Sequence, residues 1–419
     1  MNKKLIATIG FSTVAALALS ACSTKGSGGG GGSEGADGLK TEFGVTDTEI
    51  VLGGLTDSSG PFKVGGVAVT HGNQIWVDEI NAAGGICERE IVLDIRDTGY
   101  KADTAVPLYD SVKNESVGLV QIIGSAVFAA LKQKMITDQV MGSSPTIASV
   151  NLDSEVMLSV GTTFDVESIN AMSYMQEEGL LKEGDKIGAI YINNEAGQNS
   201  FLGIETYGKN HDIEVVGNAI SPTDTDLTAT VTKLKSAGVN LVHVAVPPGA
   251  LASVAVQMRA QGLDVPLVGF NSAFQPSVLA DQGVVDSLDN FYLARPDVTF
   301  NADAAKSVAD AYEAAGIQDA PSASIITGYL SGMAWGAVLE QACEDGDMTR
   351  AGLMEARKKV TSLDTQGLAG TLDFSDPGAP VTRVTSIAKI DPAAPGGLTL
   401  VAEPFVSPDA EDYKAPYQK

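Results

Sequence analysis

The sequence predicts an α/β protein that consists of two similar lobes, each built on a parallel sheet. Short, nearly continuous apolar runs alternate with segments whose apolar residues recur at helical spacing. Strands that are apolar along their length are typical of parallel sheets covered by helices on both faces. This alternation occurs twice, over stretches of similar size. The length of 419 residues also exceeds what one hydrophobic core usually serves.

The first stretch opens with the apolar run 50–56, which breaks at the turn sequence Asp-Ser-Ser-Gly-Pro. The next helix is indicated by Ile75, Trp76 and Ile80 at helical spacing, and by two glycines that stop the pattern. Residues 117–124 are apolar almost throughout, which is typical of a buried strand. We expect strands at 50–56, 90–97, 117–124 and 140–145, and helices at 67–83, at 102–113 and up to Gln139.

The second stretch repeats this order from residue 166. We expect helices at 166–181, 200–210, 227–237 and 251–261, and strands at 186–192, 213–219, 239–246 and 265–270. After them we expect helices at 302–315, 322–343 and 350–359, and short strands at 371–374, 382–390 and 398–401. Two β/α stretches of similar size indicate two lobes of similar construction.

The loops that follow the predicted strands form the candidate ligand site. In open α/β sheets, ligands bind beyond the carboxyl ends of the strands, and helices that start there offer amides to anionic or polar groups. Any one of these loops taken alone is an ordinary turn, but their equivalent positions favour a shared site. The loops are 57–65, 124–128, 143–149, 193–198, 247–249 and 271–274.

The chain is acidic, with a formal net charge of −25 at pH 7. Such a surface repels nucleic acid, so we expect no nucleic-acid partner. The hydrophobic fraction of 44% is ordinary for a folded protein, and the acidity itself is most simply read as a contribution to solubility.

The N-terminal residues predict export and membrane attachment. Two lysines precede a short apolar run, and Leu-Ser-Ala then leads to Cys22. This resembles a bacterial lipobox, in which the cysteine is lipidated and becomes the new N-terminus; an export signal with an incidental cysteine is the alternative. We expect a signal peptide at 1–21, lipidation of Cys22 and a flexible Gly/Ser tether over 22–44, which anchors the protein on the extracytoplasmic face of the membrane.

Two further cysteines remain if Cys22 carries lipid. In an oxidising compartment an even pair indicates one disulfide, between Cys87 and Cys343. Two buried free thiols are the alternative, and thiol counting on the denatured protein distinguishes them.

Signals for catalysis are weak. The three histidines, His71, His211 and His243, are not spaced as a metal pair, and His243 lies in an apolar strand, where a core position is favoured. No Walker loop, G-x-S-x-G motif or strand-linked G-x-G-x-x-G occurs. We therefore expect no enzyme, no metal and no cofactor.

Several segments resemble one protein family. The most specific is Asn-Ala-Ala-Gly-Gly-Ile at 81–86, at the end of the first helix. Ser-Gly-Pro at 59–61, Leu-Lys-Ser-Ala-Gly at 234–238 and Arg-Ala-Gln-Gly-Leu at 259–263 occur in the expected order. Over about 45–401 the chain resembles the periplasmic substrate-binding proteins of branched-chain amino acid-type ABC transporters, which have the type I periplasmic binding fold.

The resemblance implies two Rossmann-like lobes joined by three hinge crossings, one of them near 295–297, that close over a small-molecule ligand. We expect lobe 1 at 45–164 and 298–376, lobe 2 at 165–297 and 377–405, and a C-terminal tail at 406–419. The function implied is capture of a ligand and its delivery to an ABC permease, by a protein that we expect to be a monomer. A sensor of the same fold, which feeds a membrane signalling receptor, is the alternative.

The positions that hold the ligand carboxylate in amino acid-binding members carry different residues here. Phe128 stands at the position of a serine after the third strand, with Ser125 close by. Ala148 stands at the position of a threonine in the next loop, with Thr146 close by.

The positions that face the ammonium and the side chain differ as well. Asn271 replaces the acidic partner of the ammonium, and Ala196 and Pro247 replace aromatic residues. A buried ammonium without a charged partner is costly, so we expect a neutral polar, aromatic or carboxylate-only ligand, not a standard α-amino acid. An amine ligand is the alternative, with Glu195 as the substitute counter-charge for its ammonium. The candidate ligand-binding residues are Phe62, Ser125, Phe128, Thr146, Ala148, Ala196, Pro247 and Asn271.

Overall fold

The computed structural model describes residues 33–35, 38–145, 147–376 and 378–418, which belong to one compact unit. The predicted signal peptide, the lipidation site Cys22 and the candidate residue Thr146 lie outside the described residues. Within the described part, no helix combines the length and the apolar composition that crossing a bilayer requires.

The first sheet consists of five parallel strands in the order β4-β3-β5-β6-β7. Its strands are β3 (Glu49–Thr56), β4 (Glu90–Asp97), β5 (Gly118–Ile122), β6 (Gly142–Ser144) and β7 (Met157–Ser159). The helices that accompany it are α1 (Lys63–Ala82), α2 (Ala102–Val112), α3 (Ser125–Asp138), α9 (Lys306–Ala314), α10 (Ala323–Glu344) and α11 (Arg350–Lys359). The predicted alternation of parallel strands and crossover helices is therefore confirmed for this half.

The second sheet has seven strands in the order β15-β14-β12-β11-β10-β8-β9. Five are parallel, whereas β14 and β15 are added antiparallel at one edge. Its strands are β8 (Lys186–Ile192), β9 (Glu214–Ile220), β10 (Leu241–Ala245), β11 (Leu267–Gly269), β12 (Phe291–Arg295), β14 (Thr385–Ile390) and β15 (Leu398–Phe405). Its helices are α4 (Phe164–Glu177), α5 (Glu195–Asn210), α6 (Thr228–Ala237), α7 (Pro248–Gln261), α8 (Gln282–Ser287), α12 (Pro408–Asp412) and the short 3₁₀ turns η2 (Asn271–Ala273) and η3 (Pro276–Ala280).

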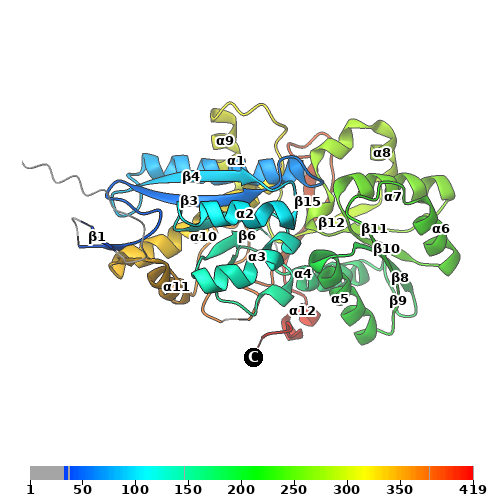
Figure 1. The fold of residues 1–419 in the computed structure, drawn as a ribbon. Helices are drawn as coiled ribbons and strands as arrows, with labels where there is room; N and C mark the ends of the chain where they lie inside the picture. The colour runs from blue at the N-terminus through cyan, green and yellow to red at the C-terminus, as the bar shows by residue number, and fades with distance from the viewer. Residues whose placement is uncertain (1–32, 36–37, 146, 377, 419) are drawn as a thin grey trace, which may run out of the picture. The chain divides into compact units, whose positions relative to one another are not determined.

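The chain passes three times between the two sheets, as Figure 1 allows the reader to follow. The passages lie between β7 and α4, between β12 and α9, and between α11 and β14. Each half thus contains segments from distant parts of the sequence, which is the connectivity of the predicted fold class. The residue limits given above for the two lobes stay a prediction.

The close contact of α1 with α10 fixes the position of the first helix. A Cβ atom at Gly72 would lie 2.0 Å from the Ile325 carbonyl oxygen, and one at Gly328 would lie 2.0 Å from the Val69 carbonyl oxygen. The Asn73 side chain also donates to the Gly328 carbonyl at 2.7 Å. Glycine inside a helix lowers helix stability by about 1 kcal/mol relative to alanine. The direct contact of the two helix backbones explains why glycine nevertheless occupies these two positions.

Cys87 and Cys343 are joined in the structure, with their Cα atoms 6.0 Å apart. Cys87 follows α1 and Cys343 lies in the last turn of α10, so the link connects the same two helices at their far ends. The disulfide itself stays a prediction that thiol counting tests.

The end of the predicted tether lies against the folded body. β1 (Ser33–Glu34) pairs with β2 (Lys40–Thr41), and β2 pairs with β13 (Asp347–Met348). Leu39 is buried, and the guanidinium of Arg350 lies 4.4 Å from the ring centroid of Phe43. These contacts are made by residues inside the range 22–44 that we predicted as tether, and that range stays a prediction.

Several predicted element boundaries were wrong. α1 begins at Lys63 and not at 67, and α5 begins at Glu195 and not at 200. The Asn194 side chain caps the start of α5 by accepting a hydrogen bond from the Gly197 amide at 3.2 Å. The strand predicted at 371–374 does not form; Leu372 makes only an isolated bridge to Leu363. Glycines and polar side chains in first turns hid both helix starts, because they are also typical of loops.

Candidate ligand-binding site

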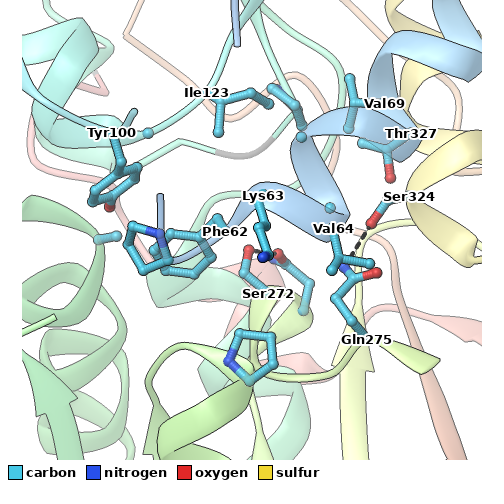
Figure 2. Close-up of a pocket in the computed structure, with 18 of the residues that line it drawn as sticks. Phe62, Lys63, Val64, Val69, Tyr100, Ile123, Ser272, Gln275, Ser324 and Thr327 are labelled. Carbon is cyan, nitrogen blue, oxygen red and sulfur yellow. Dashed lines mark hydrogen bonds between the residues drawn. The ribbon is translucent and has the colours of Figure 1, made fainter. Parts of the chain in front are cut away.

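A cavity of about 250 Å³ lies where the strand ends of the two sheets meet. All six loops that we predicted from the strand ends contribute to its wall, together with the first turns of α1 and α10. Figure 2 shows side chains from these segments, with Phe62 and Tyr100 on one side and Val69 and Thr327 on the other. The carboxyl ends of parallel strands therefore form the site, as the position of ligands in open α/β sheets leads one to expect.

Four of the candidate residues line this cavity: Phe62, Ser125, Ala196 and Asn271. Three do not. Phe128 and Ala148 are fully buried in the hydrophobic cores, and Pro247 precedes Pro248, which lines the cavity in its place. Ser125 is the first residue of α3 and lies at its cavity end, whereas Phe128 lies one turn further along the helix and packs in the hydrophobic core. Contact of any of these residues with a ligand stays a prediction.

The loop before α1 is held by a buried carboxylate. Asp57 accepts from the backbone amides of Ser59, Gly60 and Phe62 at 3.3, 2.5 and 2.9 Å. A Cβ atom at Gly60 would lie 2.6 Å from the Gly99 carbonyl oxygen, so this position requires glycine. The loop therefore presents Phe62 to the cavity from a fixed backbone.

Phe62 and Tyr100 form an aromatic wall, with ring centroids 4.8 Å apart. Tyr100 packs over Gly124, where a Cβ atom would lie 2.5 Å from the ring. Its hydroxyl accepts from the Asn194 side chain at 3.1 Å, and burial raises the pKa of Tyr100 to about 12. The phenol is thus protonated at neutral pH and bridges the two halves of the molecule.

Asn271 is held by a buried acid that the sequence did not single out. Its backbone amide and its side-chain amide both donate to the carboxylate of Glu167, at 2.9 and 2.7 Å. Glu167 is fully buried and does not line the cavity; burial raises its pKa to about 8, although the hydrogen bonds from Asn271 act against this. The Asn271 side chain is therefore oriented by Glu167.

Arg295 is a second functional candidate that sequence reasoning placed only at a hinge crossing. It ends β12, lines the cavity and pairs with Asp297 at 2.5 Å. The hydroxyl of Thr327, from α10, donates to the other oxygen of Asp297 at 2.5 Å. Burial raises the pKa of Asp297, and the charge of Arg295 acts against this. A basic residue directly before Pro296 at a strand end was the signal available in the sequence.

The charged side chains that line the cavity are basic, and one of them, Arg295, is already paired with Asp297. Lys63 and Arg295 line the cavity, whereas no aspartate or glutamate among the described residues does so. Most of the remaining wall is apolar, and its aromatic side chains are Phe62, Tyr100, Phe164 and Phe270. Such a wall favours an anionic or neutral ligand with an apolar body over a cation.

No group of three or more histidine, cysteine, aspartate or glutamate side chains in the described part of the chain could hold a metal ion. His243 lies in β10 and is 2% exposed, and burial lowers its pKa to about 3. The predicted core position of His243 is therefore confirmed.

The chain is similar to periplasmic binding proteins. The family model described as "Periplasmic binding protein" matches residues 49–397. Curated relatives include a Leu/Ile/Val-binding protein of Rhizobium johnstonii, 27% identical over 46% of this chain and 54% of that protein. A Leu/Ile/Val-binding protein homolog of Brucella melitensis is 25% identical over the same shares. The chain thus spans about half the length of the curated relatives it matches.

Solved structures share the fold over most of the chain. A fatty acid ABC transporter substrate-binding protein from Thermomonospora curvata is 32% identical, with a TM-score of 0.89, over 92% of this chain and 99% of that chain. A branched-chain amino acid ABC transporter protein from Thermus thermophilus, with bound valine, has a TM-score of 0.76 over 87% of this chain and 98% of that chain, but at 15% identity it shows the fold alone. These neighbours are named as transport components and not as enzymes. Since the family model covers most of the sequence, this chain belongs to the periplasmic binding protein family.

Proposed function

We propose that this protein captures a small organic anion with an apolar body, a carboxylic acid of the fatty acid class, and delivers it to an ABC permease. One observation carries the proposal: the cavity has mainly apolar walls, two basic side chains and no acidic side chain among the described residues. The ligand class in the name of the Thermomonospora curvata neighbour supports the same reading.

An α-amino acid fits this cavity poorly. Its ammonium would need a charged partner, and Asn271 offers only an amide that already bonds to Glu167. Glu195, the alternative counter-charge, is not among the residues that line the cavity. The curated relatives named for leucine, isoleucine and valine match over about half their length, which leaves their ligand a weak guide to this one.

Two groups are suited to hold the carboxylate. A guanidinium has five N–H donors. The structure describes one side-chain hydrogen bond donated by Arg295, which goes to Asp297, so further donors of Arg295 can bind a ligand carboxylate. The Ser125 hydroxyl is buried, has no described partner, and lies at the first residue of α3, where the helix amides also favour an anion. Both side chains line the cavity.

Closure over the ligand is supported by two hydrogen bonds that join the two halves. The Asn194 side chain donates to Tyr100, and the Gln275 side chain donates to the hydroxyl of Ser324 at 3.0 Å, which Figure 2 shows as a dashed line. Such bonds contribute about 0.5–1.5 kcal/mol each, and two bonds between Ser149 and Asn199 of α5 also join the halves, so we infer that these bonds supply part of the stability of the closed form. A bound ligand would supply the rest, and its loss would permit opening.

Calorimetry on the purified folded chain tests the ligand class. We expect octanoate and decanoate to bind, and leucine, isoleucine and valine not to bind. A ligand at a hundredfold excess over its Kd also stabilises the folded state by about 2.7 kcal/mol, which a thermal-shift series detects. Micromolar binding of a branched-chain amino acid, without binding of either fatty acid, would overturn the proposal.

We further propose that the protein is anchored by lipid on Cys22 and works with a permease at the membrane. Labelling of cells with a radioactive fatty acid should mark the wild-type chain and not Cys22→Ala. Deletion of the gene should abolish uptake of the ligand, and the wild-type gene should restore it. Normal uptake after deletion, with loss of a ligand-dependent transcriptional response, would instead identify a sensor.

A further inference from the structure

A second cavity, of about 860 Å³, adjoins the first. Three residues, Lys63, Val64 and Ser277, line both cavities, so the two spaces meet at the first turn of α1 and at η3. Figure 2 shows Lys63 and Val64 at this place, beside the hydrogen-bonded pair Gln275 and Ser324. The two cavities therefore share a boundary at these residues, which is where a ligand that reaches both would have to pass.

The second cavity also lies between the two halves of the molecule. One wall comes from α1 and the segment 319–321 before α10, and the other from η3 and the loop 392–397 between β14 and β15. α1 separates the two spaces, because Gly65, Gly66 and Val69 face the first cavity while Val67, Ala68 and His71 face the second.

Most residues in the wall of the second cavity are apolar or small, and its polar members are Ser58, Lys63, His71, Ser277 and Asp319. The loop 392–397 reads Pro-Ala-Ala-Pro-Gly-Gly, and Val64, Val67 and Leu279 are the larger apolar side chains that face it. Gly397 has a positive φ of 72°, and a Cβ atom there would lie 2.6 Å from Leu279. Asp319 is the acidic residue of this wall, and its side chain is 66% exposed. Its Oδ2 atom lies 3.7 Å from Nε2 of His71.

We propose that the second cavity holds the distal part of an acyl chain whose carboxylate lies in the first cavity. This inference rests on the proposed function. The charged end stays in the first cavity, because Arg295 and Ser125 line only that space. The apolar tail then passes Val64 and is removed from water among the small residues of the second cavity. The protein therefore selects long-chain acids over short ones.

A chain-length series measures this directly. Each buried methylene is expected to tighten binding about fourfold. Titration calorimetry on the folded chain with hexanoate, octanoate, decanoate, dodecanoate and tetradecanoate, below their micelle concentrations, should give a Kd that falls at each step.

Two variants narrow the second cavity from opposite walls, Ala320→Trp and Ala280→Trp. Both positions are exposed and line only the second cavity, so the fold should tolerate the change. We expect tetradecanoate to bind at least tenfold more weakly to each variant, with hexanoate affinity unchanged. The matched control is Ala130→Trp, an exposed position on α3 that lines neither cavity.

The possible outcomes separate the two proposals. If no fatty acid binds, the proposed function fails. If fatty acids bind but the variants weaken all chain lengths equally, or none, the inference alone is overturned. If the variants slow association and dissociation together and leave every Kd unchanged, the second cavity is an entry path and not a binding site for the tail.

Discussion

Asp165 and Asp297 are both buried carboxylates beside a passage between the two sheets, but their partners differ. Asp165 accepts from three hydroxyls, those of Ser149 at 2.5 Å, of Thr163, and of Tyr413 at 2.8 Å. Asp297 faces the guanidinium of Arg295 at 2.5 Å and one threonine hydroxyl.

The difference indicates two roles for a buried acid. Hydroxyl partners are neutral, so Asp165 ties structure together; its tyrosine partner follows α12 and joins the C-terminal segment to the start of α4. Arg383 lies near Asp165, but its described hydrogen bonds go to Ala410 and Gln418. Asp297 instead holds a cation against the cavity wall, where the unused donors of that cation remain for a ligand.

The largest expected effect separates the two acids by matched substitutions. Asp297→Asn leaves a buried guanidinium without its counter-charge, and we expect the free energy of unfolding to fall by about 3–5 kcal/mol. Asp165→Asn should cost about 1–2 kcal/mol, because hydroxyls can turn to donate or accept. Urea denaturation measures both. Equal costs for the two variants would remove the distinction drawn here.

The next prediction separates stability from binding. Replacing the ion pair by apolar residues, with Arg295→Met and Asp297→Leu together, should keep the free energy of unfolding within about 2 kcal/mol of the wild type. The same double variant should bind octanoate about 10–100-fold more weakly, since a charged hydrogen bond contributes about 1.5–3 kcal/mol. Unchanged octanoate affinity would show that Arg295 does not hold the carboxylate.

Glu167 extends the comparison to an acid held only by amides. Burial raises its pKa from 4.5 to about 8, with Arg295 lowering it and Asp297 raising it further. The unfolded chain ionises first, so the stabilisation is complete below the unfolded pKa and is lost as the pH rises from 4.5 to about 8, by up to about 1.4 kcal/mol per pH unit. Glu167→Gln should flatten this slope in denaturation curves between about pH 5 and about pH 8. A slope identical to that of the wild type would contradict the assignment.

The smallest expected effect concerns the C-terminal tie. Tyr413→Phe removes one hydroxyl from Asp165, and we expect a loss of about 1 kcal/mol in the free energy of unfolding with no change in octanoate affinity. Tyr417→Phe is the matched control, because Tyr417 is 46% exposed and should have no effect. A change in ligand affinity in Tyr413→Phe would mean that the tie also controls closure.

The sequence predicted the parts of the site that follow from local pattern. Apolar strands such as 117–124 located the sheets, and the ends of the strands located six of the segments in the cavity wall, but not the loop after β4 that carries Tyr100. It missed Glu167 and Thr327, because each meets its partner across a long separation: Thr327 bonds to Asp297 and Glu167 to Asn271, 104 residues away.

Phe128, Ala148 and Pro247 do not line the cavity, and the cause is local. Phe128 and Ala148 lie in segments that the loop positions located well, yet their side chains turn into the cores. A loop position locates a segment to within a few residues, whereas the distance of each residue from the end of the strand or helix decides whether its side chain reaches the cavity or the core. The step from Pro247 to Pro248 is such a shift by one residue.

The order of β12 and β14 in the second sheet has a consequence for biosynthesis. β12 ends at Arg295, but its antiparallel neighbour begins only at Thr385, after three helices of the other half have been made. The second sheet therefore stays incomplete on the ribosome until β15 has emerged. Export through a translocation channel, which the N-terminal sequence predicts, requires an unfolded chain. This delay would favour export, because the pairing of distant segments closes large loops late and slowly.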